Sequence, residues 1–261
     1  MLLVTNNGGL NYDFMKVALV CIAKNEENYI QEWVDYNKKL GFDNIIIYQN
    51  DWRCEIDDPT VIKLEFDGVN QQVNAYNHFI KNNLNNYEWV AFFDVDEFLV
   101  LKKHNNIKDF IQEYSEFEAI GINWYLFGDN GFEDVDIEYS VLKRFTKRQS
   151  SINPHIKSII KLTSNVIMGV HNPNCLWVNT DKKTNGGPFN QPGNDDIAVI
   201  HHYFGKTKEE FLLKRERGRA DTTIKRNVED FDGHNFNEVE DLTAYNFMYN
   251  DNNNSHNTSK H

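Results

Sequence analysis

Residues 89–98, with the sequence WVAFFDVDEF, determine the predicted fold more than any other stretch. The apolar run 89–93 is typical of a strand buried on both faces, and it leads directly into Asp94, Val95 and Asp96. Side chains two positions apart on an extended segment point to the same side, so we expect the two carboxylates to face one region. Such hard oxygen ligands suit Mg²⁺ or Mn²⁺ shared with a diphosphate. The alternative is that an aspartate here only caps a following helix.

The residues before this stretch alternate between apolar runs and helical patterns. Apolar runs at 17–23 (VALVCIA), 44–48 and 61–66 predict three strands, and residues 28–40 and 70–83 have helical spacing. With the strand at 89–93 the order is β-α-β-β-α-β, which is typical of a Rossmann-like half of an α/β fold. The loops at the carboxyl ends of these strands are therefore expected to form the site.

The second half of the chain is less regular. Strands are predicted at 119–124, 158–162, 166–170 and 197–200, a loop at 179–194, and a charged helix at 208–219. The segment 250–261 is polar and nearly free of hydrophobic residues, so it is predicted to be a disordered tail. Residues 1–16 form an N-terminal arm before the first strand.

The composition excludes several classes of protein. Of 261 residues, 27 are Lys or Arg and 39 are Asp or Glu, a net charge of −12 that argues against a nucleic-acid binder. Hydrophobic residues make up 40%, too many for a disordered chain. No apolar run reaches the length of a membrane span, and the N-terminal residues do not lead us to expect a secretion signal. The three cysteines show no paired spacing, so the sequence predicts a cytoplasmic protein with free thiols.

Several segments together resemble the metal-dependent GT-A glycosyltransferases, in the family-2-like and family-92-like branch. They are CIAKNEENYIQEWVDYN (21–37), IIIYQND (45–51), QQVNAYNHFI (71–80), FFDVDEFL (92–99), NWYLFGDNG (123–131) and IHHYFGKTKEEFLLKRERGRAD (200–221). The resemblance implies a GT-A domain over residues 17–249, with a mixed central sheet flanked by helices. It also implies transfer of a sugar from a nucleotide-sugar, with uridine diphosphate as the expected nucleotide, to a glycan acceptor.

The resemblance assigns residues to the donor and to a Mn²⁺ or Mg²⁺ ion. The donor set is Ala23, Lys24, Asn25, Glu26, Asp51, Gln72, Tyr76, Asp94, Val95 and Arg217. The metal set is Asp94 and Asp96, with His202 and His171 as competing candidates for a third ligand. A neutral imidazole is a sound ligand for Mn²⁺ beside two carboxylates.

An inverting enzyme, which the relatives imply, also needs a base for the acceptor hydroxyl. Asp129 in the loop FGDN (127–130) is the expected base, and Glu133, Asp195 and Asp196 remain open. A basic cluster at 143–148 is either a surface patch or a contact for an anionic acceptor or a membrane surface.

Two other interpretations stay open at this point. The segment FFDVDEFL is similar to the nucleophile motif of haloacid-dehalogenase phosphatases, although that motif opens its domain and here a βαβ unit precedes it. A sugar-binding or nucleotide-binding protein that kept the fold without catalysis is the second alternative.

Overall fold

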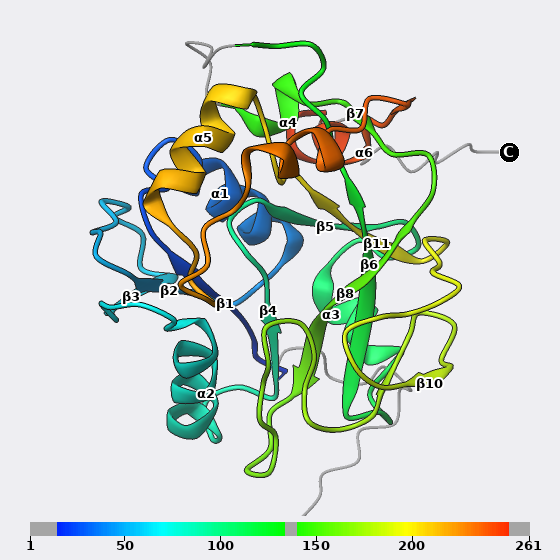
Figure 1. Cartoon of the computed structure of the whole chain (residues 1–261). Coiled ribbons are helices and arrows are strands. Elements are labelled where there is room, and N and C mark those ends of the chain that lie inside the picture. Colours follow the sequence, from blue (N-terminus) through cyan, green and yellow to red (C-terminus); the bar gives the residue numbers. More distant parts are fainter. Residues whose placement is uncertain (1–14, 134–139, 251–261) are drawn as a thin grey trace, which may run out of the picture.

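The computed structural model describes residues 15–133 and 140–250 (Figure 1). The helices are α1 (Ile30–Leu40), α2 (Gln72–Asn83), α3 (Ile107–Gln112), α4 (Val141–Arg144), α5 (Lys208–Arg217) and α6 (Thr243–Tyr249), with 3₁₀ turns η2 (Val228–Asp230) and η3 (Asp232–His234). The strands are β1 (Val17–Ala23), β2 (Asn44–Gln49), β3 (Val61–Glu65), β4 (Trp89–Phe92), β5 (Glu97–Leu101), β6 (Ala119–Leu126), β7 (Lys147–Arg148), β8 (Asn153–Lys161), β9 (Trp177–Val178), β10 (Thr184–Asn185), β11 (Ala198–His202) and β12 (Val239–Glu240). The predicted arm and tail lie almost entirely outside the described residues.

A mixed sheet organises the chain, as the α/β prediction required. Its strands run in the order β10-β9-β6-β8-β4-β1-β2-β3, and β11 joins β6 to β5. Strands β3, β2, β1 and β4 are mutually parallel, whereas β8 runs antiparallel to β4 and β6. Because parallel strands end at the same edge, the loops that follow β1, β2 and β4 lie together there, beside the point where the chain order reverses.

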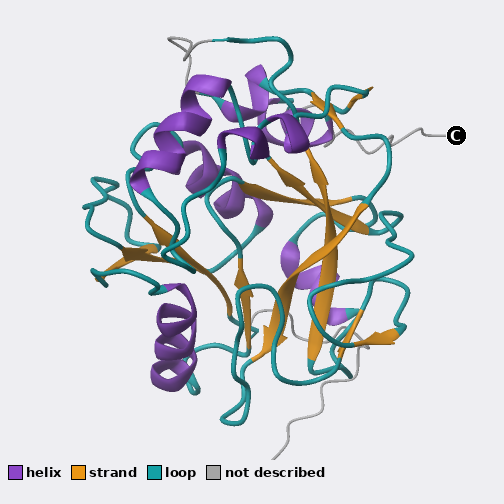
Figure 2. Ribbon diagram, viewed as in Figure 1, coloured by secondary structure: helices purple, strands orange, loops and turns teal. Residues whose placement is uncertain are grey.

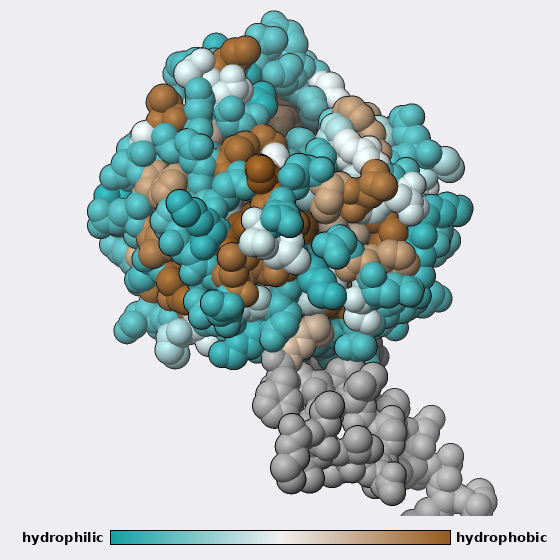
Figure 3. All heavy atoms as spheres, turned by 90° about the horizontal axis from the view of Figure 1, so that it is seen from below, coloured by the Kyte–Doolittle hydropathy of each residue, from teal (hydrophilic) through white to brown (hydrophobic). Residues whose placement is uncertain are grey.

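The sheet separates two apolar layers. Alternate residues of β1 face opposite sides, with Val17, Leu19 and Cys21 in one layer and Ala18 and Val20 in the other. Helices α1 and α3 cover the first layer and α2 covers the second (Figure 2). Seen from below, hydrophobic residues gather near the middle of the face and hydrophilic residues surround them (Figure 3).

Two of the differences from the sequence predictions lie close to the site. Residues 166–170 do not form a strand, because Met168 makes only an isolated bridge to Pro173 across a turn. Strand β5 was missed, since it begins at Glu97 directly after the paired aspartates and is only five residues long. Its antiparallel pairing with β11 places Glu97 opposite His202, so the missed strand is the one that brings His202 to the aspartates.

Candidate functional site

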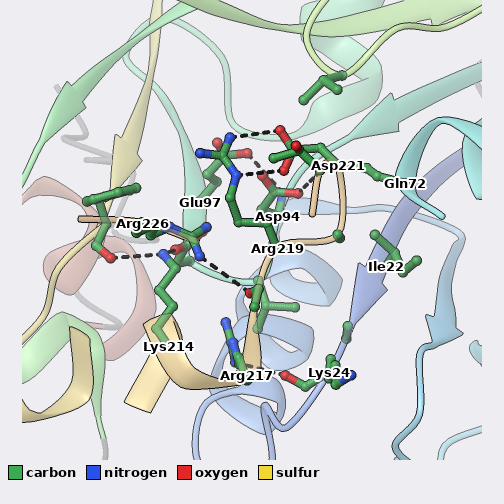
Figure 4. A pocket seen from close by; sticks show the side chains of 18 of the residues that line it. Ile22, Lys24, Gln72, Asp94, Glu97, Lys214, Arg217, Arg219, Asp221 and Arg226 are labelled. Atoms are coloured by element: carbon green, nitrogen blue, oxygen red, sulfur yellow. Dashed lines mark hydrogen bonds and ion pairs between the residues drawn. The ribbon is translucent and has the colours of Figure 1, made fainter. Parts of the chain in front are cut away.

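The site is a cavity of about 610 Å³ at the carboxyl ends of the parallel strands. Ala23 at the end of β1, Asn50 after β2 and Asp94 after β4 line it. His202 from β11 and Lys214 from α5 also line it, and Figure 4 shows Lys214 and Arg226 facing the cavity across from Gln72 and Asp94. The predicted edge of the sheet is therefore hollow and carries charged groups from both halves of the chain.

Asp94 is held by three side chains. Gln72 Nε2 donates to Asp94 Oδ1 at 2.9 Å, and the Tyr76 hydroxyl donates to the same oxygen at 3.4 Å. Both donors lie on α2, one turn apart on the same face. Lys157 Nζ from β8 donates to Asp94 Oδ2 at 2.8 Å and lies 3.4 Å from Glu97 Oε2. Burial opposes the charge of Lys157, but Asp94 and Glu97 raise its pKa, so the side chain is an ammonium.

Asp96 lies between a lysine and a histidine. Lys214 Nζ donates to Asp96 Oδ2 at 2.5 Å and to the Phe204 carbonyl at 2.9 Å. His202 Nε2 lies 3.6 Å from the other oxygen, Asp96 Oδ1. Burial alone would raise the pKa of Asp96, but Lys214 and His202 outweigh it and hold the pKa well below its ordinary value. Burial lowers the pKa of His202, and the nearby Asp96 opposes this shift.

His171, the other histidine proposed as a ligand, lines the same cavity beside an aromatic cluster. Its ring contacts those of Trp124 and His155, with centroids 5.5 Å and 5.7 Å away. Burial and Lys157 lower the pKa of His171 to about 3. Of the two histidines, His202 is the one with a nitrogen within 4 Å of an aspartate oxygen among the described ion pairs.

The loop after β1 is closed by Arg217. The guanidinium donates to the carbonyls of Lys24 at 2.8 Å and Asn25 at 3.0 Å, and it forms an ion pair with Glu26. Arg217 lines the cavity, yet its main described partners are these loop groups. Its position therefore supports a role in shaping the donor loop.

Asp51 lies beside this loop. It forms a salt bridge with Lys24 at 2.9 Å, and its carboxylate also accepts from the Gly68 amide at 3.3 Å. In the described part of the chain, Asn50 and Gly68 line the cavity while Asp51 itself does not.

The candidate bases lie elsewhere. Asp129 is not among the described residues that line the cavity, since its carboxylate accepts from the side-chain amides of Asn235 at 2.8 Å and Asn237 at 3.0 Å. Asp195 forms a salt bridge with Lys102 at 2.5 Å, also away from the lining. The sequence did not point to a role for Lys157, His155 or His234. Both histidines line the cavity. Only Lys157 left a signal, as a lysine inside the apolar run of β8.

The basic cluster at 143–148 is only partly at the surface. Arg144 is 3% exposed and makes two hydrogen bonds to Glu210, at 2.9 Å and 2.7 Å. Arg148 pairs with Asp241 at 2.7 Å and lies over the ring of Tyr125. These guanidinium groups therefore have structural partners, which weakens the expectation of a membrane contact through this cluster. None of the helices in the described ranges is both long and apolar enough to cross a bilayer.

Comparisons with known proteins agree on one family. The sequence model of glycosyltransferase family 92 matches residues 64–234. A glycosyltransferase family 92 protein of Ricinus communis is 27% identical over 219 residues, which cover 76% of this chain and 37% of that protein. One of Arabidopsis thaliana is 24% identical over 213 residues, covering 73% of this chain and 35% of that protein. The chain thus spans about a third of the length of the curated relatives it matches.

Among solved structures, 4-diphosphocytidyl-2C-methyl-D-erythritol synthase from Anaerococcus prevotii is similar with a TM-score of 0.31 and 12% identity, over 56% of this chain and 71% of that one.

Proposed function

The chain belongs to glycosyltransferase family 92, and we propose that it transfers a sugar from a nucleoside-diphosphate-sugar, with uridine diphosphate as the nucleotide, to a hydroxyl group of a glycan acceptor. The observation that carries this proposal is the short distance, 3.6 Å, between Asp96 in the turn before β5 and His202 at the end of β11, inside the cavity. An inverting course is part of the proposal. The family assignment favours a transferase over the haloacid-dehalogenase alternative.

The residues present fit a divalent cation at Asp96 and His202. Two ligand atoms that each lie about 2.1 Å from one octahedral ion are about 3 Å apart when adjacent, and somewhat more in a distorted site. The separation of 3.6 Å between Asp96 Oδ1 and His202 Nε2 is close to that value. Within the described ranges no group of three or more Asp, Glu, His or Cys residues forms a metal site, and Asp96 and His202 are the two protein ligands that we propose.

The charged groups around these ligands are arranged in pairs. Asp94 pairs with Lys157 and Asp96 with Lys214, while burial raises the pKa of the Glu97 carboxyl well above its ordinary value. Lys214 occupies Asp96 Oδ2 and keeps Oδ1 turned toward His202. When bound, Mn²⁺ or Mg²⁺ would act as a Lewis acid that neutralises charge growing on the leaving diphosphate.

Arg226 is a suitable residue to bind the diphosphate of the donor. Its guanidinium lines the cavity, and its Nε is buried without a hydrogen-bond partner among the described residues. The hydrogen bond it makes, to the Gly218 carbonyl, is long at 3.4 Å. A cation in this situation is suited to an incoming anion, because a preorganised guanidinium stabilises charge that develops on phosphate oxygens.

The test is a titration of uridine diphosphate into the metal-free protein by calorimetry, with and without Mn²⁺, repeated on Asp96→Ala. We expect Mn²⁺-dependent binding in the wild type and its loss in the variant. A calorimetric signal that is the same in both proteins would contradict the assignment of Asp96. If no nucleoside diphosphate binds at all, the transferase proposal fails and a phosphatase or a non-catalytic protein is left.

A further inference from the structure

The carboxylates that line the cavity all have partners among the described residues. Asp94 and Glu97 face Lys157, Asp96 faces Lys214, Glu26 pairs with Arg217, Asp221 with Arg219, Glu216 with Lys225, and Asp230 accepts from the Asn227 amide. A general base needs an acceptor lone pair directed at the reacting hydroxyl. These ion pairs and caps make most of the carboxylates a poor choice for that task, and Glu97, whose Oε1 has no hydrogen-bond partner among the described residues, is completely buried.

His234 offers such a lone pair in the same cavity. Its Nδ1 lies 2.6 Å from the backbone carbonyl of Asp230. A carbonyl oxygen only accepts hydrogen bonds, so the proton is on Nδ1 and Nε2 carries the lone pair. The ring also packs on that of Phe204, with centroids 4.4 Å apart, and this contact fixes its orientation. A base oriented through its second nitrogen is the arrangement that general-base catalysis requires.

The loop after β6 holds the segment that carries His234. The two side-chain amides that donate to Asp129 belong to Asn235 and Asn237, one and three residues after His234. In return the backbone amides of Asp129 and Asn130 donate to the side-chain oxygens of the same two asparagines, at 2.8 Å each. Together these hydrogen bonds join two segments 106 residues apart.

Gly128 allows this close approach. A Cβ at that position would lie 2.5 Å from the carbonyl oxygen of Phe236. The loop 127–130, which the sequence marked as functional, is therefore shaped to grip the residues after His234.

We propose that His234 is the catalytic base for the acceptor and that Asp129 is the residue that positions it. This inference rests on the proposed sugar transfer. The acceptor oxygen bonds to the anomeric carbon as the bond from that carbon to the diphosphate oxygen breaks, with its electron pair going to the diphosphate. The proton of the acceptor hydroxyl passes to His234 Nε2, and the imidazolium then releases a proton to solvent.

The other histidines in the cavity are weaker candidates. The pKa of His171 is lowered to about 3 by burial, which makes it a poor proton acceptor at neutral pH. His202 is assigned to the cation. His155 is the real competitor, because its Nδ1 lies 2.8 Å from Asn153 Oδ1 and leaves Nε2 as an acceptor. Its ring, however, lies flat on Trp124, and its segment is paired with residues 188–190, through the Ile156 and Asn190 amides, and not with the loop 127–130.

The first experiment measures release of uridine diphosphate from a panel of UDP-sugars with water as acceptor, alongside calorimetric affinity for uridine diphosphate and Mn²⁺. Removal of a general base costs about 10²–10⁴ in rate, so His234→Gln should lower kcat by that factor with the nucleotide affinity unchanged. His155→Gln is measured in parallel. His104→Gln, whose ring pairs with Glu113 at 2.9 Å outside the cavity, is the matched control and should behave as wild type.

The outcomes separate the two proposals. If the wild-type protein does not bind uridine diphosphate, the proposed sugar transfer is itself contradicted. Intact binding with normal turnover in His234→Gln, or a larger loss in His155→Gln, would overturn only the assignment of the base. A wild-type protein that binds the nucleotide but releases none from any sugar donor would count against both.

The second experiment asks whether Asp129 acts through His234. Asp129→Ala should lower kcat with nucleotide affinity unchanged, and the double variant with His234→Gln should be no slower than His234→Gln alone. Additive losses in the double variant would show an independent structural role and would overturn the positioning role. If Asp129→Ala melts early, Asn237→Ala removes one of the two amides and permits the same comparison.

Discussion

Asp96 and Asp129 both follow a strand of the same sheet, yet their surroundings are opposite. Asp96 faces an ammonium and an imidazole inside the cavity, whereas the Asp129 carboxylate faces neutral amides outside its lining. A carboxylate held by cations near a cavity is suited to binding charge. One held by amides is suited to fixing a loop. The partner chemistry, which a sequence motif does not show, separates the two roles.

The largest expected effect is on stability and concerns Lys157, the ammonium that pairs with Asp94 and Glu97. Lys157→Met keeps most of the volume but leaves Asp94 and Glu97 without their shared ammonium, so we expect a loss of about 3–5 kcal/mol in the free energy of unfolding. Urea denaturation measures it. Lys161→Met at the end of the same strand, where the ammonium is near the surface, is the control and should change stability by less than about 0.5 kcal/mol. Equal effects of both variants would show that Lys157 has no special partner role.

The next effect is catalytic. Asp96→Asn keeps the shape of the side chain but removes the charge from the cavity, and we expect kcat for nucleotide release to fall about 10²–10³-fold. Asp195→Asn removes a carboxylate that pairs with Lys102 away from the cavity lining, and it should retain wild-type turnover. Melting curves of both variants exclude misfolding. Comparable losses in the two would mean that overall charge, and not the position of Asp96, matters.

Much of the donor side could be predicted from the sequence. Strands β1, β2 and β4 are continuous apolar runs, and the polar residues after them meet at one edge because the strands are parallel. The sequence could not show that Lys157 and Lys214 neutralise Asp94 and Asp96, since those contacts span 63 and 118 residues. The contacts of Asp129, the expected base, could not be predicted for the same reason. Its asparagine partners come more than a hundred residues later, in a segment with no apolar period to mark it.

A third carboxylate tests whether a cation partner alone implies function. Glu210 is buried against Arg144 and lies outside the cavity lining in the described residues. Burial would raise its pKa, but hydrogen bonds from Arg144 and Tyr29 outweigh this and lower it from 4.5 to about 2. The stability it contributes is therefore complete above about pH 4.5 and is lost as the pH falls toward 2.

We expect the stability difference between wild type and Glu210→Gln to narrow by about 2 kcal/mol between about pH 6 and pH 3, with nucleotide affinity unchanged at neutral pH. Urea denaturation at both pH values measures the difference. Glu65→Gln, at an exposed ion pair with Arg53, should show no such dependence. A difference that stays constant with pH would contradict the depressed pKa.

The smallest expected effect concerns the loop that carries Asp129, the second carboxylate of the comparison. In Gly128→Ala the new Cβ meets the Phe236 carbonyl oxygen at 2.5 Å, so the loop must move away from the segment that carries His234. Overpacking of this kind costs about 1–2 kcal/mol in stability. We expect turnover to fall about tenfold while the affinity for nucleotide stays the same, because the donor side of the cavity is untouched. Gly233→Ala adds the same methyl group next to His234 where no heavy atom lies within 4 Å, and it should leave both quantities near wild type. If Gly128→Ala weakens nucleotide binding as strongly as it slows turnover, the loop after β6 supports the whole cavity and not the base alone.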